Sequence, residues 1–417
     1  MFRIWIYLSL KKFFLFFFNK KKYSTLSTYI ENQLCKQSKK KFAVLTSQCR
    51  IGFLYILKYL KKKDPDKNEI IFAAYNLPEM INVAKNLNYK IVFCDIDYQT
   101  GFINLKEVIK LISSKTNSIV LTNMFNTHED SVKLKKIASK FNITLIEDNA
   151  IYFDNFKFNK KYVFSGSLGH YTVYSFNIMK NVSSFYGGAV TTNDKFFYKY
   201  YQKEEKRLTN FKTLLITKQI FVYFVLKFMS VNLFYRYLFF KIIKNAHLKN
   251  FTTILKLIYP SLKFIERKFP KYYFTKISKL SLYTTYVQLN DKQQRKLNFS
   301  LRKKKNKLYY KKLKKINNKA IHLLNIKDFN YQNFLDFPIL VNNKFKFNEF
   351  FLKHGIEVRF RHYYNCAKMF GEDKIFKNSE LFEQRLICLP NHPKIKSKYI
   401  YFIIQKVNEY ALKYKNI

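Results

Sequence analysis

Small, turn-forming and acidic residues are all scarce in this chain. Its 417 residues include only eight glycines, seven prolines and five cysteines, and 27 acidic side chains stand against 77 lysines and arginines. The cysteines form no CxxC pair, which excludes zinc-finger spacing and is typical of a reducing compartment where thiols stay unpaired. They are Cys35, Cys49, Cys94, Cys366 and Cys388. We therefore expect a cytoplasmic protein without a metal site.

The formal net charge of +50 suggests nucleic acid as a partner at first sight. However, Lys, Asn, Ile, Phe and Tyr dominate while Gly, Pro and Ala are scarce, which is the pattern of an A/T-rich coding sequence. The lysine excess is therefore not by itself a ligand signature, and no RRM-type aromatic motif is present. Nucleic acid is not an expected partner, although a surface this basic attracts nucleotides and acidic lipids.

The chain is long enough for two or three domains. Residues 1–40 form an apolar and basic N-terminal segment, in which the run FFLFFF spans residues 13–18. This segment has no small-residue cleavage site, so we expect no cleaved signal peptide.

Residues 41–205 alternate short apolar strands with amphipathic helices. This rhythm predicts a mainly parallel sheet covered by helices on both faces, with ligands at the carboxyl ends of the strands. The expected strands are Phe42–Leu45, Glu69–Ala73, Lys90–Cys94, Ser118–Thr122, Ile143–Ile146 and Tyr171–Tyr174, and the expected helices are Pro78–Leu87, Leu105–Ser113 and Val132–Lys140.

Residues 206–270 form a basic, hydrophobic, helical insertion. Between residues 206 and 265 there are eleven lysines and arginines and no acidic residue. Three interpretations stay open: a helical layer packed on the protein itself or on a second subunit, a peripheral contact with anionic lipid, or a membrane span. Lys227 makes a membrane span energetically unfavourable, because it places a charge inside the apolar run.

Residues 271–417 predict a smaller C-terminal α+β domain. The helical stretch Leu289–Ile316 comes first and is rich in lysine. A strand at Phe337–Val341, a helix at Phe347–His354, a turn into a strand at Gly355–Val358 and a terminal helix at Tyr399–Tyr414 follow.

Four of the eight glycines fall between Gly166 and Gly188, so the backbone must turn tightly or approach another group closely there. They surround Ser175-Phe176-x-x-x-Lys180, and the acidic pair Glu147-Asp148 closes an earlier strand. A lysine that holds an aldehyde as an imine and an acid that keeps a ring nitrogen protonated are what pyridoxal phosphate requires. The pattern therefore predicts a pyridoxal-phosphate site, with Lys180 as the catalytic residue.

These motifs resemble the DegT/DnrJ-type nucleotide-sugar aminotransferases, which have the pyridoxal-phosphate fold type I. The matching segments are Thr46–Arg50, Val92–Asp97, Asn123–Asp130, Ile146–Ala150, Gly166–Gly169, Ser175–Asn181, Gly187-Gly188, His354–Ile356 and Leu389–Pro393. The resemblance implies a large domain built on a seven-stranded-type sheet over residues 41–205. It also implies a Schiff base on Lys180, Asp148 at the pyridine nitrogen and Ser175 at the phosphate.

The same resemblance implies that the backbone around Cys49, Arg50 and Ile51 cradles the cofactor phosphate. The expected reaction moves an amino group from glutamate to a nucleotide-linked keto-sugar, for amino-sugar and surface-glycan synthesis, in a homodimer. Lysine rather than histidine at position 180 favours transamination over the family's dehydratase branch. The expected location is the cytoplasm or the inner face of a membrane, with residues 206–265 as the membrane contact.

Three departures from the family pattern keep alternatives open. Ile151 stands where a ring-hydroxyl partner is usual, Gln48-Cys49 replaces the small residues of the phosphate turn, and Phe274–Leu282 replaces a Gly-x-Asn-x-Arg segment. The alternatives are a catalytically degenerate protein of the same fold, or a protein whose basic surface binds membranes or other anions.

Overall fold

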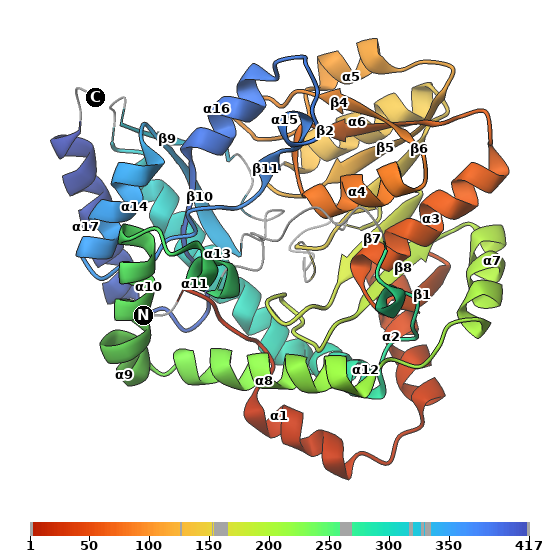
Figure 1. Cartoon of the computed structure of the whole chain (residues 1–417), viewed down its shortest axis with the longest axis horizontal. Coiled ribbons are helices and arrows are strands. Elements are labelled where there is room, and N and C mark those ends of the chain that lie inside the picture. The colour runs from red at the N-terminus through yellow and green to blue at the C-terminus, as the bar shows by residue number, and fades with distance from the viewer. Residues whose placement is uncertain are drawn as a thin grey trace.

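The computed structural model describes residues 3–125, 127–151, 153, 166–258, 269–316, 320–326, 329 and 335–414. A seven-stranded sheet, on the right in Figure 1, has the order β1-β8-β7-β6-β5-β2-β4. Only β8 runs antiparallel to its neighbours. The strands are β1 (Phe42–Thr46), β2 (Glu69–Ala73), β4 (Lys90–Cys94), β5 (Thr116–Thr122), β6 (Thr144–Asp148), β7 (Tyr171–Ser175) and β8 (Gly188–Thr192).

Helices cover both faces of this sheet, because successive strand residues point to opposite sides. In β2, Ile70 and Phe72 enter one hydrophobic core and Ile71 enters the other. The first core is closed by α3 (Cys49–Lys63) and α4 (Pro78–Asn86), and the second by α5 (Leu105–Leu111) and α6 (His128–Lys140). A parallel sheet buried on both faces is the predicted large domain, and the fold prediction is confirmed.

Two helices from distant parts of the chain pack together beside β1. In α2 (Tyr23–Ser38), the side chains of Leu26, Ile30 and Leu34 are buried at the spacing of one helix face. They share a core cluster with residues of α12 (Lys279–Asn290). The division of the chain at residues 40 and 271 remains a prediction.

The C-terminal part is a smaller α+β unit. Its antiparallel sheet has the order β12-β10-β9, from β9 (Ile321–Leu323), β10 (Asp336–Val341) and β12 (Leu386–Pro390). Its main helices are α13 (Lys292–Leu313), α14 (Lys344–Lys353), α16 (Lys377–Arg385) and α17 (Ser397–Lys413). The strand expected at Gly355–Val358 is not formed; Arg359 alone bridges to Cys388 there. The remaining short elements are β3 (Tyr75–Asn76), β11 (Tyr364–Asn365), α15 (Cys366–Met369), η4 (Lys271–Tyr273) and α7 (Lys195–Lys206).

The insertion is helical in its described part. It comprises α8 (Thr213–Met229), α9 (Asn232–Phe234), the π-helical turn η2 (Tyr235–Phe239), α10 (Phe240–Leu248) and α11 (Thr252–Ile258). Within the described residues, no single helix is long and apolar enough to cross a membrane, whereas the pair Thr213–Met229 and Asn232–Leu248, bent by 80°, passes on length and composition alone. Near α8 lie α1 (Leu10–Phe14) and η1 (Leu15–Phe18).

Candidate active site

The two members of the acidic pair face opposite sides of β6 and have different surroundings. Glu147 is fully buried, and its carboxylate holds the glycine-rich loop that follows residue 165. Its Oε1 accepts hydrogen bonds from the Gly166 N–H at 2.7 Å and from Asn123 Nδ2 at 2.8 Å. Its Oε2 accepts from the N–H groups of Leu168 and Gly169, each at 3.1 Å. Glu147 is therefore a structural residue that shapes the loop.

The pair Gly187-Gly188 allows β8 to touch the turn between β1 and α3. A Cβ at Gly188 would lie 2.4 Å from the Cys49 nitrogen and 2.5 Å from the Gln48 carbonyl carbon. Gly187 has φ of +135° and bridges to Gln48. These glycines are needed because backbone lies directly against backbone, and the contact fixes the turn from which α3 begins.

Lys180 lies in the loop between β7 and β8, and its neighbours hold that loop from both sides. The Ser183 N–H donates to Gln288 Oε1 at 3.0 Å, and Gln288 Nε2 donates to the Ser183 carbonyl at 2.7 Å. The buried Arg302 guanidinium donates to Asn181 Oδ1, next to the lysine. Helices α12 and α13 therefore fix the loop that carries Lys180.

The N-terminal segment reaches the same loop. The Tyr7 N–H donates to Ser183 Oγ at 3.0 Å, and Arg302 donates to the Tyr7 hydroxyl at 2.5 Å. Four residues earlier along the chain, Arg3 Nε lies 3.4 Å from Glu357 Oε1 in a buried ion pair. The chain start thus connects the Lys180 loop to the C-terminal unit.

Lys180 and Asp148 lie in one buried electrostatic environment. Burial lowers the pKa of Lys180, and the nearby negative charge of Asp148 works in the opposite direction. Burial raises the pKa of Asp148, while the N–H of Ala150, which donates to its Oδ1 at 3.0 Å, and Lys180 oppose that rise. The Cys49 thiol belongs to the same environment, because burial and the negative charge of Asp148 raise its pKa while the positive charge of Lys180 opposes that rise. The structure therefore brings together three of the predicted site residues.

Ser175 also comes to this place, since it is the last residue of β7 and pairs with Gly188 across the sheet. Arg50 is tied to the aromatic side chain of Tyr273: its Nη1 donates to the tyrosine hydroxyl at 2.7 Å, and its guanidinium carbon lies 5.3 Å from the ring centroid. The Ile51 N–H donates to the Gln48 carbonyl at 3.1 Å. Of the predicted phosphate donors, the Ile51 N–H is therefore already engaged, while the Cys49 N–H heads the helix without a helical carbonyl to bond.

The segment after Gly355 forms a second side of the site, and the sequence did not predict this. Burial lowers the pKa of His362 well below its usual range, and the positive charges of Arg359 and Lys180 act in the same direction. Among the described residues, the buried Nδ1 of His362 has no hydrogen-bond partner. Burial raises the pKa of the Tyr363 hydroxyl, and the nearby negative charge of Asp148 acts in the same direction. The alternating sequence Arg359-Phe360-Arg361-His362 is a visible signal of a functional segment. Its proximity to Lys180 depends on the tertiary fold and could not be predicted from the sequence.

These residues fit pyridoxal phosphate. A half-buried lysine, a buried strand-end carboxylate and the amino end of α3 occupy one site, and the unpaired His362 Nδ1 leaves a polar group for a ligand. Ile151, which replaces the usual ring-hydroxyl partner, is partly buried and packs against the large core. Within the described residues, no cluster of His, Cys, Asp and Glu could hold a metal ion.

The fold is that of the fold type I pyridoxal-phosphate aminotransferases. It matches, with a TM-score of 0.69 and 18% identity, the solved structure of Helicobacter pylori PseC, an aminotransferase of pseudaminic acid biosynthesis, over 97% of this chain and 96% of that one. Residues 22–207 match the model of the DegT/DnrJ/EryC1/StrS aminotransferase family, in agreement with the motifs of this part of the chain.

Curated relatives match over a shorter stretch. An uncharacterized protein of Methanocaldococcus jannaschii is 32% identical over 155 residues, which are 37% of this chain and 39% of that protein. GDP-perosamine synthase of Escherichia coli O157:H7 is 27% identical over 168 residues, which are 40% of this chain and 45% of that enzyme. The chain therefore spans less than half the length of these relatives.

Proposed function

We propose that this protein is a pyridoxal-phosphate-dependent aminotransferase that moves an amino group from glutamate to a nucleotide-linked keto-sugar. The observation that carries the proposal is that the half-buried Lys180 and the buried Asp148 lie close enough for the charge of each to act on the other. A lysine whose pKa is lowered, beside an acid at a strand end, is a functional-site signal, because perturbed pKa values cluster at such sites.

When bound, pyridoxal phosphate supplies the electron-accepting ring that amino transfer requires. Lys180 supplies the amine that holds the cofactor and then carries a proton to and from the substrate carbon. Because burial lowers the pKa of Lys180, more of the neutral amine is present near neutral pH than in an exposed lysine. Asp148 would hold the ring nitrogen protonated, and the Cys49 N–H and Ser175 hydroxyl would bind the phosphate.

The site's charge fits an anionic substrate. Arg359 lies near Lys180, where its Nε also pairs with Asp336 Oδ2 at 3.1 Å, and Arg50 stands at the start of α3. A nucleotide-linked sugar carries a diphosphate that such groups bind, and GDP-perosamine synthase, which resembles this chain, has a nucleotide sugar in its name. We further propose a cytoplasmic homodimer that contributes to surface-glycan synthesis.

The test compares wild-type protein with Lys180→Ala and Asp148→Asn in a coupled assay with glutamate and a panel of nucleotide-linked keto-sugars. Lys180→Ala should abolish turnover without lowering the free energy of unfolding, since the change removes a buried amine. Asp148→Asn should retain cofactor but slow turnover by roughly a hundredfold or more. Full activity of Lys180→Ala would end the assignment.

A further inference from the structure

A wide apolar face lies on the outside of α8 and its neighbours. Phe221, Phe224 and Phe228 stand at positions i, i+3 and i+7 of α8, and their exposed fractions are 69%, 38% and 44%. Beyond the bend, Leu233 and Leu238 are also more than one-third exposed. Soluble proteins rarely leave so many large apolar side chains together in water, so this face marks an interaction surface.

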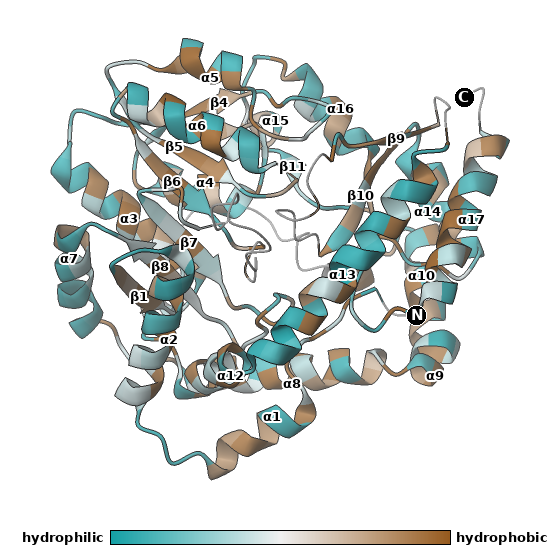
Figure 2. Ribbon diagram, turned by 180° about the vertical axis from the view of Figure 1, so that it is seen from behind, coloured by the Kyte–Doolittle hydropathy of each residue, from teal (hydrophilic) through white to brown (hydrophobic). Residues whose placement is uncertain are grey.

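The N-terminal helices extend the same face. Phe14, Phe17 and Phe18 are at least half exposed. The rings of Phe13 and Phe224 lie 5.5 Å apart, and those of Phe14 and Phe224 lie 6.3 Å apart. Figure 1 and Figure 2 show α1 beside α8 on one outer edge of the molecule. We call this combined surface of α1, η1, α8, α9 and η2 the apolar ledge.

The lysine within α8 does not interrupt the ledge. Lys227 turns inward, where its Nζ donates to the Ile6 carbonyl at 2.9 Å and lies 5.3 Å from the centroid of a Trp5 ring. Burial lowers the pKa of Lys227 to about 8. The outward face of α8 from Phe221 to Phe228 therefore carries no charge.

Basic residues surround the ledge and outnumber the acidic residues near it, among them Asp291, which pairs with Lys12 of α1 at 2.5 Å. No Asp or Glu occurs in residues 1–30 or 206–265. The exposed cations next to the apolar residues are Lys11, Lys20, Lys21, Lys22, Lys212, Lys218, Arg236, Lys241 and Lys249. An apolar face with a predominantly cationic border is complementary to a surface that is apolar inside and negatively charged outside.

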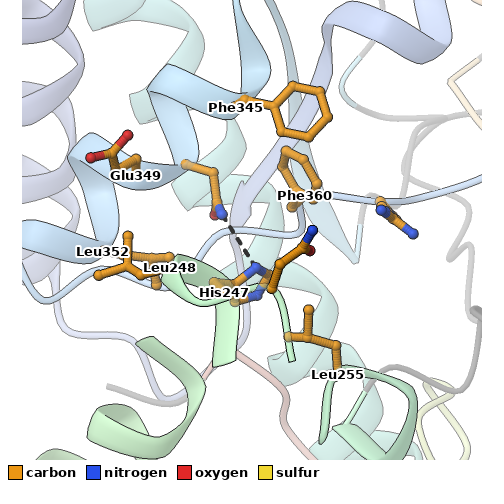
Figure 3. A pocket seen from close by; sticks show the side chains of 10 residues that line it. His247, Leu248, Leu255, Phe345, Glu349, Leu352 and Phe360 are labelled. Atoms are coloured by element: carbon orange, nitrogen blue, oxygen red, sulfur yellow. Dashed lines mark hydrogen bonds between the residues drawn. The ribbon is translucent and has the colours of Figure 1, made fainter. Parts of the chain in front are cut away.

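The far end of the insertion is held by the C-terminal unit. A pocket of about 280 Å³ lies between α10 and α14, lined by His247, Leu248, Phe345 and Leu352 among others (Figure 3). His247 Nδ1 lies 3.4 Å from Asn348 Nδ2 across this junction. The helices are thus docked on the protein by one side, which leaves the ledge outward.

We propose that the apolar ledge binds the surface of an anionic phospholipid bilayer, with α1 and α8 lying in the plane of the headgroups. The 80° bend between α8 and the following helices suits helices that lie on a membrane. A second copy of this chain fits the ledge less well, because it would bring two cationic borders face to face. The proposal is independent of the aminotransferase assignment, since it needs neither cofactor nor substrate.

The experiment is co-sedimentation of the full-length protein with vesicles of phosphatidylcholine alone or with added phosphatidylglycerol. Wild-type protein should bind the anionic vesicles and bind less as salt increases. The double variant Phe221→Glu, Phe228→Glu should bind at least roughly tenfold more weakly, because both side chains lose their transfer into the bilayer. Phe196→Glu is the matched control, since Phe196 is 76% exposed on α7, away from the ledge, and should bind as wild type.

Two results would overturn the proposal. Equal binding of the double variant and the wild type would show that lipid does not contact α8. Loss of a dimer in the double variant on gel filtration, with vesicle binding unchanged, would identify the ledge as a subunit interface. Both measurements are made on apoprotein, so a failed aminotransferase assay does not affect them.

Discussion

Glutamine in place of Glu147 should destabilise the protein although the side chain keeps its size. Both carboxylate oxygens accept hydrogen bonds in a fully buried place. An amide offers one oxygen only, so whichever way it is turned, its NH₂ group faces two donors. Either Gly166 and Asn123 or Leu168 and Gly169 lose their acceptor.

The magnitude follows from these two lost contacts. A hydrogen bond to a charged group contributes about 1.5–3 kcal/mol, and a buried donor without a partner adds a cost of its own. Removal of a buried negative charge offsets part of this loss, so we expect a net destabilisation of roughly 3 kcal/mol. An unfolding entropy of about 2.1 cal/mol/K per residue turns this into a fall in Tm of roughly 3–4 °C.

The assay is urea and thermal unfolding of the apoprotein, with Asp148→Asn as the matched control. Asp148 is the next residue of the same strand, but burial raises its pKa, so a neutral amide should leave the free energy of unfolding unchanged or higher near pH 7. A Glu147→Gln protein as stable as wild type would refute the structural role of Glu147. So would an Asp148→Asn protein that is the less stable of the two.

Two further predictions concern packing and pH. Gly188→Ala should weaken pyridoxal-phosphate binding by roughly a hundredfold, because the new Cβ lies 2.4 Å from the Cys49 nitrogen and displaces the turn by about 1 Å. Gly371→Ala is the control for backbone strain alone: its φ is +80° and its Cβ meets nothing within 4 Å, so it should leave the affinity unchanged, and equal affinities for the two variants would contradict this. Stability should rise with pH between about 8 and 10.5, because burial lowers the pKa values of Lys227, Lys305 and Lys344 to about 8, so the folded chain releases protons that the unfolded chain keeps. Lys227→Met should remove about a third of that rise in urea titrations, and an unchanged profile would contradict the role of Lys227.

The sequence predicts most of the large domain because its strands are short apolar runs of clear periodicity. Glu69–Ala73 and Lys90–Cys94 are strands with the bounds expected for them. Helix α6 begins at His128, earlier than the expected Val132, because Thr127 and Asp130 form a capping box before the apolar residues. Such local signals are readable from sequence when the apolar pattern and the caps are considered together.

Features that depend on distant contacts could not be predicted in this way. The separate surroundings of Glu147 and Asp148 depend on which face of β6 meets the glycine-rich loop and which meets Lys180. The approach of His362 to Lys180 joins segments that are far apart in the sequence. The inward turn of Lys227 required the N-terminal segment to pack beneath α8. Tertiary packing decides each of these.

The most direct measurement for the central claim is the visible absorption spectrum of purified protein titrated with pyridoxal phosphate and then with glutamate. The account predicts a band of lysine-bound cofactor that glutamate bleaches and that Lys180→Ala lacks. A flat spectrum at saturating pyridoxal phosphate would contradict the account and favour a protein of this fold that has lost its cofactor.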